Sequence, residues 1–185
     1  MTTRAAAHAL VAELATAAIG RTFNQYRNGP RAGLLGTRLA SYLCARETST
    51  LLLVGEAAGY RGARVSGIPF TSDRQLKGHG PAEASATIVH RVLAELGLEE
   101  SVLLWTVVPT HPGTASGNRT PTRSEVAAGL PFVERLAAGR TVIAVGRIAE
   151  RALGAAYVRH PAHGGGKDFR AGLVELLDCG APRPA

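Results

Sequence analysis

The clearest chemical feature of this sequence is a carboxylate and two aromatic side chains that follow an apolar run in a glycine-rich segment. The run 51–54 has no polar face, which is typical of a strand buried on both sides of a parallel sheet. Glu56 follows it, and Tyr60 and Phe70 lie among four glycines in the segment up to residue 72. Ligands of open α/β sheets bind at the carboxyl ends of strands, so this segment is expected to hold a flat ligand.

Two further glycine-containing loops follow predicted strands. The three loops span residues 55–75, 109–121 and 159–167, and the last contains His160. Because parallel strands end at the same edge of a sheet, the loops are expected to converge there. The sequence therefore predicts one binding or catalytic site made from all three loops.

The common nucleotide, hydrolase and metal motifs are absent from the sequence. The glycines at 55, 59 and 62 have the spacing GxxxGxxG, which is not the dinucleotide fingerprint, and no GxSxG occurs. Lys167 follows three glycines, but Asp168 replaces the Ser or Thr of a P-loop. The loop histidines lack the spacing of a zinc site. They are His111, His160 and His163.

Composition predicts one basic domain over residues 1–185. Lysine and arginine number 21 against 14 aspartates and glutamates, a net charge of +7 that favours a polyanionic partner. Two cysteines, Cys44 and Cys179, are too few for a disulfide framework or a four-cysteine cluster. His8 and Glu13 interrupt the alanine-rich N-terminal stretch, which argues against a signal peptide, and no segment has the length of a membrane span. A cytoplasmic protein is expected.

The elements that must position these side chains alternate between helical patterns and short apolar runs, which predicts an α/β domain. Strands are expected at 51–54, 102–108, 141–145 and 157–158. Helices are expected at 4–19, 34–46, 82–96, 122–138 and 147–153, with a last one ending near 177. Thr122 and Glu125 have capping-box spacing, and Pro131 is expected to kink or split the helix that they begin.

Five short motifs occur in order across about 120 residues: GEAAG, GIPF, NRTPT, VGR and RHP followed by glycines. This series resembles the uracil-DNA glycosylase superfamily, especially its bacterial branches whose first motif begins Gly-Glu-Ala. The resemblance implies a three-layer α/β/α sandwich with a short central parallel sheet. It implies a monomer that acts on uracil in single- or double-stranded DNA, beside the bacterial nucleoid, without a metal, an iron–sulfur cluster or another cofactor.

The resemblance assigns chemistry to His160 and Glu56. His160 matches the histidine of the second motif, where a donor stabilises negative charge on O2 of the leaving uracil; the alternative is a turn cap before Pro161. The family's water-activating aspartate falls on Ala57, one position after Glu56. Glu56 therefore either orients water and offsets positive charge on the sugar, or holds the loop through hydrogen bonds.

The resemblance also assigns the base pocket. Phe70 matches the stacking phenylalanine, with a core anchor as the alternative. Thr106 stands where relatives carry the asparagine that reads uracil, so discrimination should be weaker or come from other groups; an ordinary strand threonine is the alternative. Tyr60 is placed near C5 of the base, and Ala57 and Ala58 are expected to line the pocket.

DNA contacts are expected from polar and glycine residues of the loops, with a solvated charged surface as the alternative for the basic ones. Ala162 and His163 are candidates for a wedge in the duplex, and Asn118 and Arg119 are as well explained by structural support of the site. The expected DNA-binding residues are Arg61, Asn118, Arg119, His163, Gly164, Gly165, Gly166 and Lys167.

The expected function is a monofunctional uracil-DNA glycosylase of base excision repair, with water as the nucleophile. A relative that removes hypoxanthine or xanthine is an alternative, because a threonine accepts more bases than an amide does. The missing aspartate and asparagine also permit a non-catalytic protein that binds damaged or abasic DNA. A nucleotide-binding regulatory domain that does not bind DNA is the third alternative.

Overall fold

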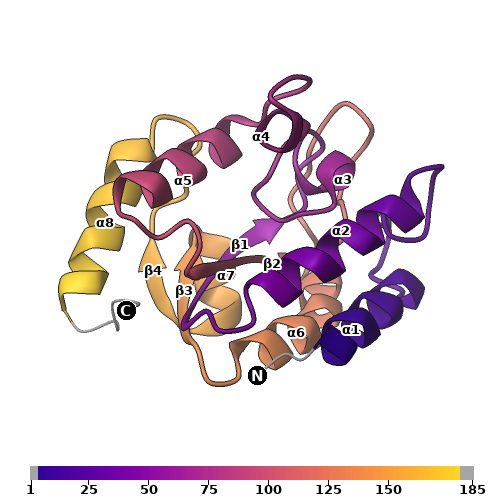
Figure 1. The fold of residues 1–185 in the computed structure, drawn as a ribbon, viewed down its shortest axis with the longest axis horizontal. Coiled ribbons are helices and arrows are strands. Elements are labelled where there is room, and N and C mark those ends of the chain that lie inside the picture. The colour runs from indigo at the N-terminus through magenta and orange to yellow at the C-terminus, as the bar shows by residue number, and fades with distance from the viewer. Residues whose placement is uncertain (1–3, 180–185) are drawn as a thin grey trace.

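A four-stranded, all-parallel sheet runs through the middle of the molecule in the computed structural model, which describes residues 4–179 (Figure 1). Its strands are β1 (Leu51–Ala57), β2 (Val102–Val108), β3 (Thr141–Val145) and β4 (Ala156–Val158), in the order β2-β1-β3-β4. The chain leaves β1 toward β2 and returns to β3 on the other side of β1. This order places a topological switch point at the carboxyl ends of β1 and β3, where open α/β sheets bind ligands.

The apolar run of β1 is buried because alternate residues enter two separate cores. Leu52 and Val54 join one core with Trp105, whereas Leu51 and Leu53 join the other. All four side chains of the run are fully buried, as a strand covered on both faces requires. The three-layer α/β/α architecture predicted from the sequence is confirmed.

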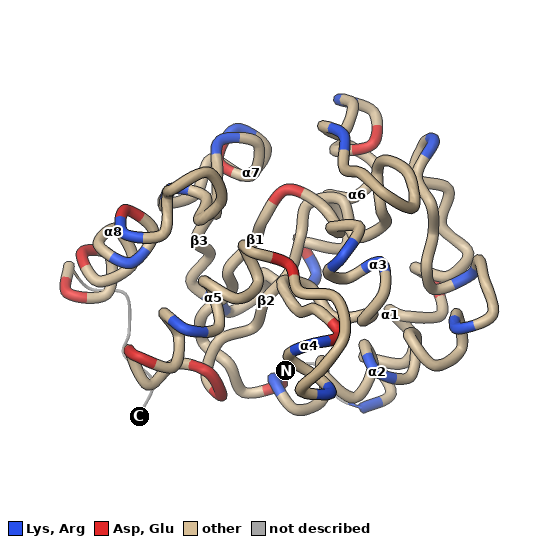
Figure 2. Tube along the Cα trace, turned by 90° about the horizontal axis from the view of Figure 1, so that it is seen from above, with Lys and Arg blue, Asp and Glu red and all other residues tan. Residues whose placement is uncertain are grey.

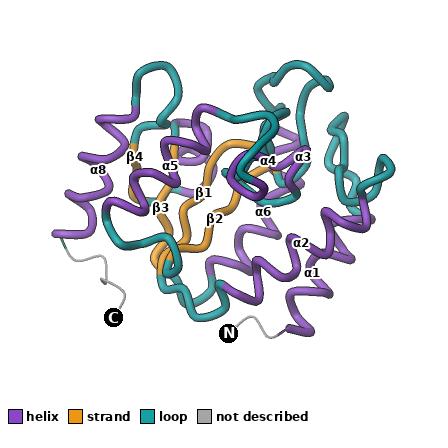
Figure 3. The backbone as a smooth tube through the Cα atoms, turned by 45° about the horizontal axis from the view of Figure 1, so that its top comes forward, coloured by secondary structure: helices purple, strands orange, loops and turns teal. Residues whose placement is uncertain are grey.

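Helices cover both faces of the sheet. The first core includes residues of α1 (Arg4–Thr16), α2 (Ala32–Ala45), α6 (Arg123–Ala137) and α7 (Arg147–Leu153). The second core includes residues of α5 (Ala84–Glu95) and α8 (Gly166–Asp178), and the short helices α3 (Ala63–Ser66) and α4 (Asp73–Lys77) follow β1. Within the described residues, no helix has the length and apolar character to cross a membrane. Figure 3 shows long loops gathered at the upper end of the sheet in that view.

Two strands, 102–108 and 141–145, and the helix 147–153 have the predicted bounds. β1 is longer than predicted, because Gly55 pairs with Thr106 and Ala57 with Val108 of β2. Glu56 therefore lies on the strand and not in the loop expected from residue 55. Pairing with a distant strand extends β1 beyond its apolar run, and the run alone does not contain that information.

Several helix predictions need correction. The segment 55–75, expected as a loop, contains α3 and the beginning of α4, and α8 begins at Gly166 inside the predicted loop 159–167. The first helix ends at Thr16 and not at residue 19. Thr122 and Glu125 form the predicted capping box, but Pro131 does not split α6, which continues to Ala137 with Pro131 exposed.

Gly129 is expected to be irreplaceable where α6 crosses β2. A Cβ at Gly129 would overlap the carbonyl oxygen of Val107 and lie 3.0 Å from its carbonyl carbon. Gly129→Ala should lower the free energy of unfolding by about 1–3 kcal/mol, although alanine ordinarily favours a helix. Urea unfolding measures this change.

Gly33 in α2 is the matched control, because no atom lies within 4 Å of a Cβ placed there. Gly33→Ala should raise the free energy of unfolding by about 0.5–1 kcal/mol. Changes of the same sign in the two variants would contradict the close approach of α6 to β2.

Candidate active site

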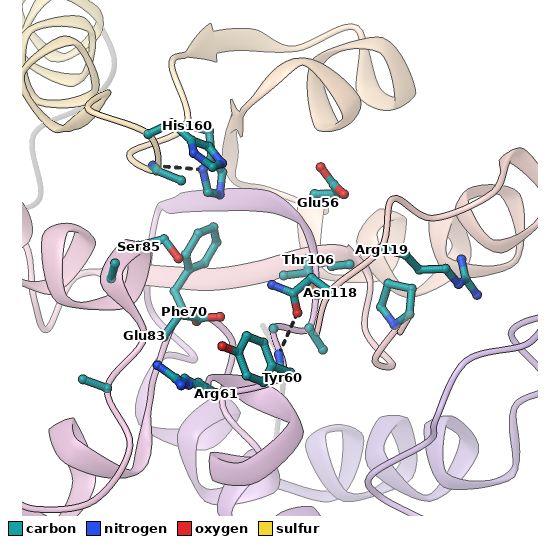
Figure 4. A pocket seen from close by; sticks show the side chains of 18 residues that line it. Glu56, Tyr60, Arg61, Phe70, Glu83, Ser85, Thr106, Asn118, Arg119 and His160 are labelled. Carbon is teal, nitrogen blue, oxygen red and sulfur yellow. Dashed lines mark hydrogen bonds between the residues drawn. The ribbon is translucent and has the colours of Figure 1, made fainter. Parts of the chain in front are cut away.

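A cavity of about 580 Å³ lies at the carboxyl edge of the sheet (Figure 4). It is lined by the ends of β1 and β2 and by segments after β1, β2 and β4, so the structure brings the three predicted loops together. Eleven of the predicted site residues line it: Glu56, Ala57, Ala58, Tyr60, Arg61, Phe70, Thr106, Asn118, Arg119, His160 and His163. Gly164, Gly165, Gly166 and Lys167 are not among the lining residues. The individual roles of all these residues stay predictions.

His160 follows β4 and presents a neutral imidazole. The backbone N–H of Ala162 donates to His160 Nδ1 at 3.2 Å, so Nδ1 is the acceptor and the proton resides on Nε2. Burial lowers the pKa of His160, and nearby His163 lowers it further. Gly146, in the VGR motif, makes room for this side chain, because a Cβ there would lie 3.2 Å from the Cβ of His160. The site therefore contains an N–H donor without a full positive charge.

Glu56 offers a carboxyl group to the cavity. Among residues 4–179 this carboxyl group has no hydrogen bond or ion pair, so the loop-holding alternative has no partner there. Burial raises the pKa of Glu56. A carboxylate in this environment is a stronger base than one in water.

Phe70 forms a wall of the cavity in a strained backbone conformation. Its φ of 51° is in the left-handed region that phenylalanine rarely adopts. The ring packs on Gly55, where a Cβ would lie only 2.8 Å from Phe70 Cε2. Phe70 also belongs to the second core, so it is at once a core residue and part of the cavity wall. The first glycine of GEAAG thus provides the space for this ring.

Thr106 uses its hydroxyl within β2. Its Oγ1 donates to the carbonyl oxygen of Val108 at 3.1 Å, and the residue is 3% exposed. This is the local bond that the alternative interpretation of Thr106 expects. The donor that would read a base is therefore already engaged, and only the lone pairs of the hydroxyl are left for a ligand.

Asn118 and Arg119 tie the loops together. The N–H of Tyr60 donates to Asn118 Oδ1 at 2.9 Å, and Arg119 binds both carboxylate oxygens of Glu125 at 2.6 and 2.8 Å. The bonds from Arg119 and from the N–H groups of Thr122 and Arg21 lower the pKa of Glu125 to about 2. The structure thus gives both residues a supporting role, and their contact with DNA stays a prediction.

His111 is a structural residue that sequence reasoning considered only as a metal ligand. It is fully buried, with Nδ1 2.7 Å from the carbonyl oxygen of Ala58 and Nε2 2.7 Å from that of Thr114. The ring thus lies between a carbonyl group of the first loop and one of the second, and it joins the two loops. No local sequence signal identifies this role, because its partners are backbone atoms.

Two of the three glycines after His160 serve close packing. A Cβ at Gly165 would overlap the carbonyl oxygen of His160, and one at Gly166 would lie 3.2 Å from Ile88 Cγ2. Gly164 and His163 have φ values of 80° and 53°. Steric contacts and two positive φ values thus define this turn.

Basic residues lie around the molecule, including positions near α3, α4 and α7 (Figure 2).

Comparison with known proteins agrees with this architecture. Residues 42–184 match the family model of the uracil DNA glycosylase superfamily. No curated protein matches the sequence. Among solved structures, the crystal structure of wild-type SMUG2 from Pedobacter heparinus superimposes with a TM-score of 0.69 at 14% identity, over 97% of this chain and 98% of that chain. At this identity the likeness shows a shared fold.

The Glu125–Arg119 pair should make stability depend on pH in the acid range. The pKa of Glu125 falls from its ordinary 4.5 to about 2 on folding, so its contribution is complete above about 4.5 and is lost as the pH falls toward 2. Glu125→Gln should lower the free energy of unfolding by about 2 kcal/mol at pH 7. The difference from the unmodified protein should shrink between pH 4.5 and 2.

Urea unfolding at several pH values measures this difference. Glu134→Gln, an exposed change on the same helix, is the control and should be nearly neutral throughout. A difference that stays constant across the acid range would show that the charge of Glu125 is not what stabilises the loop.

Proposed function

Because this chain belongs to the uracil-DNA glycosylase superfamily, we propose that it is a monofunctional DNA glycosylase that hydrolyses the N-glycosidic bond of a uracil flipped out of DNA. The supporting observation is one cavity that combines an aromatic wall, a free carboxyl group and a neutral imidazole donor. Superfamily membership supports DNA glycosylase activity, and the geometry suggests how each group would act. The product is an abasic site.

Base binding must offset the cost of extrusion. Removing a base from the stack costs a few kcal/mol in lost stacking and pairing. The ring of Phe70 provides a new stacking surface, held in place by its backbone and by the contact with Gly55. A face fixed before the base arrives loses little conformational entropy on binding.

His160 stabilises the leaving base. As the bond from N1 to C1′ breaks, its electron pair moves into the uracil ring and negative charge grows on O2. The Nε2–H of His160 donates to this oxygen, which stabilises the charge more in the transition state than in the ground state. A neutral donor does this without giving up a proton.

Glu56 acts on the sugar side of the bond. Water adds to C1′ as the base leaves, and one proton of that water must be accepted. The unpaired carboxylate of Glu56 orients the water, accepts the proton and offsets positive charge on the sugar. This role replaces the aspartate that the chain lacks at Ala57.

A second candidate substrate class is supported by Thr106. Its hydroxyl proton is engaged by Val108, so it imposes little selection on the base. Hypoxanthine and xanthine in DNA are therefore candidate substrates beside uracil.

We propose further that the protein is a monomer that acts on single- or double-stranded DNA in the bacterial cytoplasm.

The decisive experiment incubates the protein with single- and double-stranded oligonucleotides containing uracil, hypoxanthine or xanthine, followed by alkaline cleavage. We expect strand breaks at uracil, and His160→Ala should lower the rate of base release about 10²- to 10³-fold. Binding of damaged DNA without any cleavage would identify a non-catalytic protein. Full activity of His160→Ala would disprove the role of that side chain.

Glu56→Gln tests the carboxylate separately. It should lower kcat about 10²-fold or more while KM changes little, because the charge matters mainly in the transition state. Since burial raises the pKa of Glu56, activity should fall with decreasing pH at a higher value than for an ordinary carboxyl group. Single-turnover rates measure both effects. Equal rates for Glu56→Gln and the unmodified protein would show that Glu56 does not activate the water.

A further inference from the structure

A second carboxyl group lines the cavity and has no role in the reaction described above. Glu83 precedes α5, and its carbonyl oxygen accepts hydrogen bonds from the N–H and hydroxyl of Thr87. Its side chain lines the same cavity as Phe70 and His160 (Figure 4). The first turn of α5 thus fixes the position of Glu83 at the site.

The first loop is shaped around the Glu83 carboxyl group. A Cβ at Gly59 would overlap Glu83 Oε1, and a Cβ at Gly62 would overlap Oε2. The loop needs glycine at these two positions because the carboxyl group of Glu83 occupies the space that a side chain would fill. The first loop and the segment that precedes α5 are fitted to each other here. This packing fixes the carboxyl group of Glu83 without a hydrogen bond to it.

The carboxyl group of Glu83 is available to a ligand. Among residues 4–179 it has no hydrogen bond and no ion pair. Burial raises the pKa of Glu83 to about 7. A carboxyl group in its neutral form carries one O–H donor beside one C=O acceptor, whereas the ionised form only accepts.

We propose that Glu83 binds the pairing edge of the extruded base and determines which bases the cavity accepts, an inference that rests on the proposed glycosylase function. Uracil, hypoxanthine and xanthine all present an N–H beside a C=O on that edge. A neutral carboxyl group accepts from the N–H and donates to the C=O. Glu83 thereby takes over the base recognition for which Thr106 has no free donor.

Asn118, another polar residue of the cavity, is less suited to this task. It is exposed, and its Oδ1 already accepts from the N–H of Tyr60, so fewer of its acceptor positions are left for a base. In contrast to Asn118, Glu83 has both carboxyl oxygens free of hydrogen bonds within residues 4–179.

Recognition by Glu83 should weaken as the pH rises, because the ionised form cannot donate to the base C=O. Other titratable or charged groups share the cavity with Glu83. They are Glu56 from β1, Tyr60 and Arg61 from the first loop, Arg119 from the second, and His160 and His163 from the third. A variant that keeps those groups and removes only the titration of Glu83 separates the contributions.

Glu83→Gln is that variant, because an amide retains one donor and one acceptor at any pH. The ratio of its kcat/KM on uracil-containing DNA to that of the unmodified protein should rise as the pH increases through about 7. Glu83→Ala should lose about tenfold or more in kcat/KM at pH 6.5, since both hydrogen bonds are lost. Glu134→Gln makes the same chemical change on an exposed part of α6 and should leave activity unchanged.

Affinity for abasic-site DNA separates base recognition from a structural role. An abasic site has no base edge, so Glu83→Ala should bind it as tightly as the unmodified protein does, with the same thermal unfolding midpoint. A pH-independent ratio for Glu83→Gln, or full activity of Glu83→Ala, would overturn the proposal. Weaker binding of abasic DNA by Glu83→Ala would overturn it in favour of a structural role.

The same variants distinguish failure of this inference from failure of the proposed function. If the unmodified protein cleaves no substrate, the glycosylase proposal is wrong. Base recognition is then measured as the preference for uracil-containing over abasic DNA in binding. Loss of that preference in Glu83→Ala would still support base recognition by Glu83. An unchanged preference in this variant would disprove that role.

Discussion

The parallel pairing of β1 with β2 on one side and β3 on the other is the constraint on which the site depends. It brings the carboxyl ends of these strands to one edge and extends β1 to Ala57, so that Glu56 stands on a hydrogen-bonded strand. β4 pairs with β3 and brings His160 to the same edge. Groups carried on a sheet are held more precisely than groups on free loops, as chemistry at a single bond requires.

Glycine acts in this site chiefly by leaving space for other side chains. Gly55 leaves room for the Phe70 ring, Gly146 for His160, and the pair Gly59 and Gly62 for the carboxyl group of Glu83. Four glycines thus leave room for three side chains of the cavity. Bound phosphate is not needed to explain any of these four positions.

The sequence predicts the strands and their common edge because burial on both faces requires continuous apolar runs, as in 51–54 and 102–108. The capping box at Thr122 is equally local and is confirmed. Glu83 and His111 could not be predicted, because their roles arise from contacts with residues far away in the chain or with backbone atoms. Glu83 had one weak signal, the unexplained glycines at 59 and 62, whose partner only the fold identifies.

The cavity also has a consistent electrostatic character. Burial shifts the pKa of Glu56 and Glu83 upward and that of His160 downward, so each of the three groups is shifted toward its neutral form. In the proposed reaction the base enters as a neutral molecule and leaves with a negative charge. The neutral donors of His160 and Glu83 bind the neutral base without repelling it, and their dipoles interact most strongly once that charge develops. Burial that favours the neutral forms of these two groups in the free protein therefore favours the transition state over the bound substrate.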